Sequence, residues 1–159
     1  MYARDHAGIA TPIGPIRIEG DETALTSIRI GNAGTMSKGS AAAVRAAAEQ
    51  LEQWFAKERE DFDLPLVPTG TPRGDALRAG LIAVGYGETL SYGALAQLLG
   101  SSPRAIGQLC ARNPYPIVVP CHRVLGSGGA LGQYSGGDGP KTKSWLLEHE
   151  RRLPEGTLL

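Results

Sequence analysis

The most informative part of the chain is residues 113–124, which read Asn113-Pro114-Tyr115-Pro116-Ile117-Val118-Val119-Pro120-Cys121-His122-Arg123-Val124. Three apolar residues between two prolines predict a short buried segment, either a strand or an extended stretch. This segment leads directly into a cysteine that is followed by a histidine and an arginine. The pattern therefore places a thiol, a base and a cation together at the end of a rigid, buried piece of chain.

Cys121 carries the chemical interest of this stretch. A free cysteine is most often a small buried hydrophobic residue, and Cys110 fits that description because it lies on the apolar face of a predicted helix. Cys121 instead precedes His122 and Arg123, and a nearby base or cation increases the thiolate fraction of a cysteine. Lowering a thiol pKa by about two units requires about 2.7 kcal/mol of preferential stabilisation of the anion. Neighbours in sequence need not face each other, so the Cys-His pair alone also fits a cysteine hydrolase.

Two short helices are predicted immediately before residues 113–124. Ser91 caps the first helix, and Gly100 stands where a left-handed residue ends it. Pro103 is tolerated in the first turn of the second helix, which ends at Asn113-Pro114. The residues expected to face inward are Leu95, Leu98 and Leu99 in the first helix and Ile106, Leu109 and Cys110 in the second. Two helices joined by a glycine-containing turn predict a helix-turn-helix, although an ordinary corner between two helices has the same pattern.

The first half of the chain predicts a small sheet covered by a helix. Ile16 and Ile18 alternate with polar residues, and a second such run covers 25–30 after a Gly-Asp turn. Together these runs indicate a hairpin. Residues 41–55 have the apolar spacing of a helix, and Ser40 is its expected N-cap.

A change of composition separates this half from the rest. The stretch 62–72 is rich in proline and reads as an extended linker. We therefore expect an N-terminal α/β domain over 1–66 and a mainly helical C-terminal domain over 67–159. Further helices are predicted over 76–84 and from Pro140 onward.

Composition and length describe an ordinary globular protein. The chain has 159 residues, of which 42% are hydrophobic and 20% charged, a balance that excludes a disordered chain. No apolar run approaches the roughly 18 residues that span a bilayer, and Arg4, Asp5 and His6 interrupt any signal-peptide core. Two cysteines cannot make a disulfide framework. We expect a soluble cytoplasmic protein with free thiols and no membrane partner.

Metal and nucleotide sites are not indicated. Cys110, Cys121, His122 and His149 lack the short Cys-x-x-Cys or His-x-x-x-His pairs of zinc sites. The glycine-rich segment 126–139 has neither a Walker lysine pattern nor the G-x-G-x-x-G of a dinucleotide site. The formal net charge is zero, but the part after position 100 carries a small basic excess, which is compatible with a polyanionic partner.

Residues 113–124 strongly resemble the active-site segment of the O6-alkylguanine-DNA alkyltransferases, also called methylated-DNA–protein-cysteine methyltransferases. The hallmark of that family is Pro-Cys-His-Arg-Val preceded by Asn-Pro at this spacing. Other segments that match the family are Thr11-Pro12-Ile13-Gly14, Tyr86-Gly87-Glu88-Thr89, Ser91-Tyr92-Gly93, Tyr134-Ser135-Gly136-Gly137 and Trp145-Leu146-Leu147-Glu148-His149-Glu150. The resemblance spans nearly the whole chain. It implies a ribonuclease-H-like α/β N-terminal domain, with a small antiparallel sheet and a helix, and a mainly helical C-terminal domain that contains the helix-turn-helix.

The resemblance also implies the catalytic residues. Cys121 corresponds to the alkyl acceptor, His122 to the base that acts on the thiol through a water, and Glu150 to the glutamate that orients this histidine. Such an order of nucleophile, base and orienting group is the logic of a catalytic triad. Asn113 corresponds to the asparagine that braces the active-site turn. Tyr134 corresponds to the tyrosine that contacts the flipped base and gives a proton to the departing guanine.

A base must leave the duplex to reach such a thiol. The resemblance implies that Arg104 fills the gap in the stack, that Tyr92 displaces the 3′ phosphate, and that the second helix of the helix-turn-helix enters the minor groove. The carbonyls of Cys121 and Val124 would read the exocyclic amine of the base. The remaining substrate and DNA contacts that we expect are Ala105, Gly107, Arg123 and Ser135.

The implied activity is direct repair of double-stranded DNA. Cys121 would take the alkyl group from O6-alkylguanine, and less efficiently from O4-alkylthymine, in a single turnover. No cofactor or metal is implied, and a monomer is expected. The alternative is an alkyltransferase-like protein that binds the lesion without transferring the alkyl group, but such relatives usually lack the cysteine.

Three features depart from the family pattern. Leu77 replaces a tryptophan after Gly-Thr-Pro, and Gly85 stands where proline is usual, so a looser domain interface is expected. The turn before Arg104 is shorter than usual. The stretch from Gly137 to Trp145 is slightly longer, which would alter the pocket wall.

Overall fold

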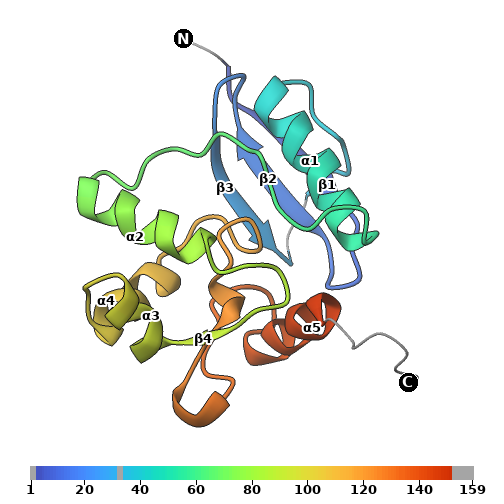
Figure 1. Cartoon of the computed structure of the whole chain (residues 1–159). Helices are drawn as coiled ribbons and strands as arrows, with labels where there is room; N and C mark the ends of the chain where they lie inside the picture. Colours follow the sequence, from blue (N-terminus) through green and yellow to red (C-terminus); the bar gives the residue numbers. More distant parts are fainter. Residues whose placement is uncertain (1–2, 32–33, 152–159) are drawn as a thin grey trace.

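A three-stranded sheet forms the N-terminal part of the computed structural model, which describes residues 3–31 and 34–151 (Figure 1). Strands β1 (Asp5–Ile9), β2 (Ile16–Gly20) and β3 (Leu25–Ile30) form an antiparallel meander in the order β1-β2-β3. Ile18 of β2 pairs with Ile28 of β3. The predicted hairpin is therefore confirmed, and β1 extends the sheet on the other side of β2.

Helix α1 (Ala42–Phe55) covers one face of this sheet (Figure 1). Its buried side chains recur every three or four residues, as expected for an amphipathic helix; they are Ala43, Val44, Ala47, Ala48, Leu51 and Trp54. The expected cap at Ser40 is wrong, because the N-cap is Ala41 and its side chain makes no capping hydrogen bond. The Asp5 carboxylate instead accepts hydrogen bonds from the backbone N–H groups of Ala41 and Ser40, at 2.8 and 2.7 Å. These bonds lower the pKa of Asp5.

The proline-rich linker is attached to the sheet. The backbone N–H of Leu25 donates to the carbonyl of Pro65 at 2.8 Å, and that of Val67 donates to the carbonyl of Leu25 at 3.2 Å. The hydroxyl of Tyr115 donates to the same Leu25 carbonyl at 2.6 Å and accepts from the Val67 N–H at 3.1 Å. The sheet, the linker and the start of residues 113–124 are therefore joined by one group of hydrogen bonds. The domain boundary between residues 66 and 67 stays a prediction.

The C-terminal part consists mainly of helices, as expected. They are α2 (Pro72–Ile82), α3 (Tyr92–Leu98), α4 (Pro103–Ala111) and α5 (Pro140–Glu150). Helix α2 begins before the predicted residue 76 because the Thr71 hydroxyl accepts from the Gly74 N–H at 2.9 Å, which caps the helix one position before Pro72. Leu77 is buried on α2, in the position expected of the larger family residue.

Helices α3 and α4 form the predicted helix-turn-helix. The Ser91 and Ser102 side chains cap the two helices. Their hydroxyl oxygens accept hydrogen bonds from the backbone N–H groups of Ala94 and Ala105, at 3.0 and 3.1 Å. Gly100 has φ +63°, the left-handed conformation that ends α3. Leu98 was expected to face inward, but its side chain is 73% exposed. It falls one residue out of the buried stripe because α3 is short and buries only the face that carries Leu95.

The segment 117–119 is buried but is not the expected strand. The chain turns here, since the Val119 N–H donates to the Tyr115 carbonyl at 2.9 Å and Ile117 has φ +76°. A positive φ is unfavourable for a β-branched residue, and Ile117 is held there in the core with 1% exposure. The turn leads into a short 3₁₀ helix, Cys121–Arg123, which immediately follows Pro120.

A two-stranded parallel ladder connects the cysteine segment to the helix-turn-helix. Strand β4 (Leu90–Ser91) pairs with β5 (Val124–Leu125), with Leu90 opposite Val124. Because β4 runs directly into α3, this ladder places Tyr92 beside the chain that carries Cys121. In the part of the chain that the structure describes, no helix is long and apolar enough to cross a membrane.

Candidate active site

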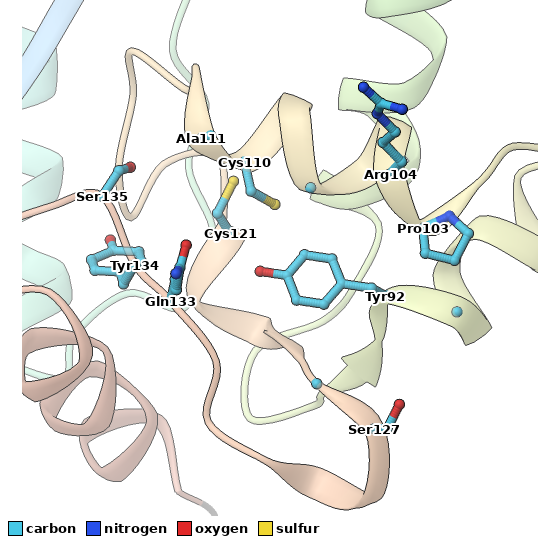
Figure 2. A pocket seen from close by; sticks show the side chains of 13 residues that line it. Tyr92, Pro103, Arg104, Cys110, Ala111, Cys121, Ser127, Gln133, Tyr134 and Ser135 are labelled. Carbon is cyan, nitrogen blue, oxygen red and sulfur yellow. The ribbon is translucent and has the colours of Figure 1, made fainter.

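Cys121 lies at the wall of a cavity of about 660 Å³ (Figure 2). Helices α3 and α4 bound the cavity on one side, and residues of the segment 126–135 bound it on the other. The Cys121 side chain is 4% exposed. Figure 2 shows the Tyr92 hydroxyl pointing into the cavity from α3. A ligand in this cavity would therefore contact both the thiol and the helix-turn-helix.

Asn113 ties the end of α4 to the cysteine. Its side-chain N–H donates to the Val119 carbonyl at 2.9 Å and to the Cys121 Sγ at 3.4 Å. Its Oδ1 accepts from the Tyr115 N–H at 2.9 Å. One amide side chain thus fixes both sides of the strained turn, and it holds the sulfur at a set distance from α4.

Behind the cysteine, His122 and Arg123 converge on Glu150, the last residue of α5. The His122 Nε2 lies 3.0 Å from a Glu150 carboxylate oxygen. The Arg123 guanidinium donates to the two oxygens of the same carboxylate at 2.9 and 2.6 Å, and to the Val84 carbonyl at 2.6 Å. The His122 Nδ1 is buried and has no hydrogen-bond partner among the described residues.

The charges in this cluster follow from its burial. Burial acts to raise the pKa of Glu150, but its contacts with His122 and Arg123 outweigh burial and lower that pKa to about 2. Burial lowers the pKa of His122 despite the opposing effect of Glu150. At neutral pH the site therefore combines a neutral imidazole with a charged carboxylate. A neutral imidazole can accept a proton, and the adjacent carboxylate then stabilises the imidazolium.

Lys143 of α5 is a second charged group in the interior, and it was not among the expected site residues. It is completely buried. Its ammonium donates to the carbonyls of Val124 and Gln133, at 2.7 and 3.2 Å. Burial lowers the pKa of Lys143, whereas the thiols of Cys110 and Cys121 raise it, so its charge acts on both sulfurs. The sequence signal was its spacing from Leu146 and Glu150, which puts all three on one helical face.

Tyr134 lies in the wall opposite α4. Burial, aided by the nearby Cys121, raises the pKa of Tyr134, and its hydroxyl has no hydrogen-bond partner among the described residues. Gly136 is needed to seat the ring, because a Cβ there would lie 2.9 Å from the Tyr134 Cε2. A protonated phenol without an acceptor is therefore held at the edge of the site.

Comparison with known proteins agrees with this geometry. Residues 75–152 match the DNA-binding domain of the 6-O-methylguanine DNA methyltransferases, and residues 6–68 match their ribonuclease-like domain. The methylated-DNA–protein-cysteine methyltransferase of Mycobacterium tuberculosis is 36% identical over 157 residues, which cover 94% of this chain and 95% of that protein. The chain belongs to the 6-O-methylguanine DNA methyltransferase family.

The names of two further relatives mention DNA. A DNA base-flipping protein of Thermus thermophilus is 37% identical over 147 residues, covering 91% of this chain and 99% of that protein. The crystal structure of Mycobacterium tuberculosis OGT in complex with DNA matches with a TM-score of 0.77 and 35% identity, over 91% of this chain and 92% of that one. The two-domain fold expected from the sequence is that of the family, and its C-terminal domain is a DNA-binding domain.

Most residues expected from the resemblance gather around Cys121. Those that line the cavity with it are Tyr92, Arg104, Gly107, Tyr134 and Ser135. Asn113, His122 and Glu150 lie behind the thiol or beside it, as described above.

Three other expected substrate or DNA contacts, Ala105, Arg123 and Val124, are not among the residues that line this cavity. Arg123 is 5% exposed and its guanidinium is engaged by Glu150 and Val84, so the expectation that it contacts the substrate is wrong. The carbonyl of Val124 accepts a hydrogen bond from Lys143, and its expected contact with the base stays a prediction. Ala105 lies on another face of α4 and lines a separate cavity, so its contact with DNA stays a prediction.

Proposed function

We propose that this chain repairs double-stranded DNA by accepting the alkyl group of O6-alkylguanine, and less efficiently that of O4-alkylthymine, on Cys121 in a single turnover. The observation that carries the proposal is the position of Cys121. Its sulfur is held by Asn113 at 3.4 Å, lies next to the buried pair of His122 and Glu150, and borders a cavity bounded by the helix-turn-helix. This arrangement supplies a nucleophile, a base and room for a base taken out of the duplex.

The first step is removal of the thiol proton. The neighbouring Cys110 sulfur and burial hold the pKa of Cys121 well above its ordinary value, so the thiol requires a base. His122 is neutral, and its Nδ1 is free of protein partners among the described residues. It takes the proton through a water, and Glu150 stabilises the resulting imidazolium. Lys143 stabilises the thiolate by its charge.

The second step transfers the alkyl group. The Cys121 thiolate attacks the alkyl carbon, an S–C bond forms and the bond from that carbon to O6 breaks. The electron pair of the broken bond stays on the departing guanine, which takes a proton from Tyr134, and the tyrosinate regains a proton through water from the His122 imidazolium. A thioether has no easy leaving path, so each molecule reacts once.

The DNA side of the proposal rests on α3 and α4. Arg104 is exposed and lines the cavity, so its side chain is available to fill the space that an extruded base leaves. Flipping costs a few kcal/mol, and less for a poorly paired damaged base. A Cβ at Gly107 would touch nothing within 4 Å, so no packing within the protein requires this glycine. A glycine inside a helix lowers stability by about 0.5–1 kcal/mol relative to alanine. Close approach of the minor groove to α4 would explain why a glycine stands here.

Intact-protein mass spectrometry tests the proposal. The protein is mixed with an equimolar duplex that contains one O6-methylguanine, with Cys121→Ala as the control. We expect a gain of about 14 Da on Cys121, absent from the control and not increased by a second portion of duplex. Tight binding to the lesion without a mass gain would overturn alkyl transfer and support the non-catalytic sensor. Repeated turnover of an ester or amide would instead support a cysteine hydrolase.

A further inference from the structure

The active-site cavity contains a second thiol, that of Cys110. Figure 2 shows Cys110 on α4 and Cys121 below it, both among the residues that line the same cavity. Both cysteines are free. From the sequence, Cys110 was expected to be a packing residue of the helix. Cys110 instead lies at the cavity wall with 8% exposure, whereas Ile106 of the same helix is completely buried in the core.

The fold holds these two sulfurs together. Cys110 lies in the last turn of α4, three residues before Asn113, and Asn113 donates to the Cys121 Sγ at 3.4 Å. Figure 2 shows the two thiol side chains side by side in the wall of this cavity. Asn113 therefore fixes the end of α4 relative to the 3₁₀ helix, which keeps the two thiol side chains at the same cavity wall.

The surroundings favour a shared charge on this pair. The contact with Cys121 lowers the pKa of Cys110, while the same contact and burial raise that of Cys121. When two ionisable groups interact this strongly, the first proton is lost from the pair, and its apparent pKa belongs to both residues. The Lys143 charge acts on both sulfurs. A thiolate beside a second thiol, in a cavity that a small solute can enter, is the usual setting of a redox-reactive cysteine pair.

We propose that Cys110 and Cys121 form a reversible intramolecular disulfide when a small hydroperoxide enters the cavity, which blocks and protects the alkyl acceptor. This goes beyond the proposed repair reaction and does not require it.

The chemistry balances without a metal or a cofactor. The thiolate of one cysteine attacks the outer oxygen of the hydroperoxide, the O–O bond breaks, and water (or an alcohol) leaves as the sulfur becomes a sulfenic acid. The thiol of the other cysteine then attacks that sulfur, an S–S bond forms and a second water leaves. Two thiols have lost two electrons and two protons to one hydroperoxide. An added dithiol reverses the reaction by exchange.

The two cysteines fall in different tryptic peptides, which makes the bond directly observable. Cleavage after Arg104, Arg112 and Arg123 releases residues 105–112, with Cys110, and residues 113–123, with Cys121. The full-length protein is treated with hydrogen peroxide, blocked with a thiol reagent, and digested with and without reduction. We expect an intact mass about 2 Da lower before digestion, and one joined peptide that separates into the two on reduction.

Cys110→Ser provides the matched control, compared with its own untreated sample. In this variant a sulfenic acid that forms on Cys121 has no second thiol to react with, so it should proceed to the sulfinic acid, which a dithiol does not reverse. Alkyl acceptance should therefore return after reduction in the unsubstituted protein and be lost in the variant. Cys110→Ala gives a second variant should the serine disturb the fold.

Three results would overturn the proposal: oxygen uptake by the unsubstituted protein without the joined peptide, a disulfide between two molecules on a non-reducing gel, or equal recovery of the variant on reduction. The peptide readout needs no alkyl transfer. A failure of the repair assay with a joined peptide present would count against the proposed function alone, and the reverse pattern against the disulfide alone.

Discussion

Replacing Glu150 by glutamine should destabilise the protein strongly at neutral pH, and this destabilisation should decrease as the pH falls toward 2. The carboxylate lies in the interior, 2.6 and 2.9 Å from the Arg123 guanidinium and 3.0 Å from His122. Removing one partner of a buried ion pair leaves the other charge uncompensated, which typically costs about 3–5 kcal/mol. In Glu150→Gln the orphan is the guanidinium of Arg123, which is 5% exposed.

The pKa of Glu150 gives a second measure of the same interaction. Folding lowers this pKa from its ordinary 4.5 to about 2. Each unit corresponds to about 1.4 kcal/mol, so the ionised carboxylate contributes about 3 kcal/mol to the free energy of unfolding. Because the folded pKa is the lower one, this contribution is complete above about pH 5 and is lost as the pH falls toward 2. The two routes agree on about 3 kcal/mol.

Urea denaturation at pH 7, 5 and 3, followed by tryptophan fluorescence, measures both effects. Trp54 packs 6.4 Å from the His122 ring and reports on the site. The control is Glu148→Gln on the same helix, where the carboxylate pairs with Arg151 at 3.4 Å but both side chains are more than half exposed. That variant should change the free energy of unfolding by less than about 1 kcal/mol. A loss below about 1 kcal/mol at pH 7 in Glu150→Gln, or an unchanged acid dependence, would refute the reasoning.

Three further substitutions probe other contacts. Tyr115→Phe removes the hydroxyl that joins Leu25 and Val67, and should lower the free energy of unfolding in urea by about 1–3 kcal/mol; an unchanged midpoint would contradict the bridge. Lys143→Met removes the charge that acts on both thiols, and single-turnover kinetics should show transfer slowed about tenfold or more, as for one pKa unit, with binding to lesion DNA retained in a mobility-shift assay. Arg104→Ala should leave the unfolding free energy within about 0.5 kcal/mol and slow transfer from duplex DNA but not from free O6-methylguanine; equal slowing of both would exclude a role in base flipping.

Local sequence patterns were sufficient to predict the helix ends at which a single residue determines the backbone conformation. Ser91 and Ser102 cap their helices with their own side chains, and Gly100 ends α3 because it adopts a positive φ. Each of these depends on residues within four positions along the chain. The helix-turn-helix could therefore be located from the sequence before its helices were seen.

Local sequence patterns gave wrong predictions where a residue distant in sequence determines the local structure. The N–H groups at the start of α1 are capped by Asp5, from 35 and 36 residues away, so the nearby Ser40 is not needed. Ile117 turns with a positive φ because Asn113 and the core hold the segment from both sides, whereas its β-branched side chain alone favours a strand. In the same way, Arg123 follows Cys121 and His122 in sequence, but its partner, Glu150, comes from another helix.

Helix α5 carries two buried charges of opposite sign that fix the chain after Cys121. Lys143 and Glu150 are seven residues apart, two turns of one face. Glu150 holds the side chains of His122 and Arg123, and Lys143 holds the carbonyl of Val124. Three consecutive residues after Cys121 are thus fixed by one helix, while Asn113 fixes the sulfur from α4. The cysteine lies between two supports, so in the proposed reaction the alkyl group is accommodated on the side of Cys121 that faces the cavity.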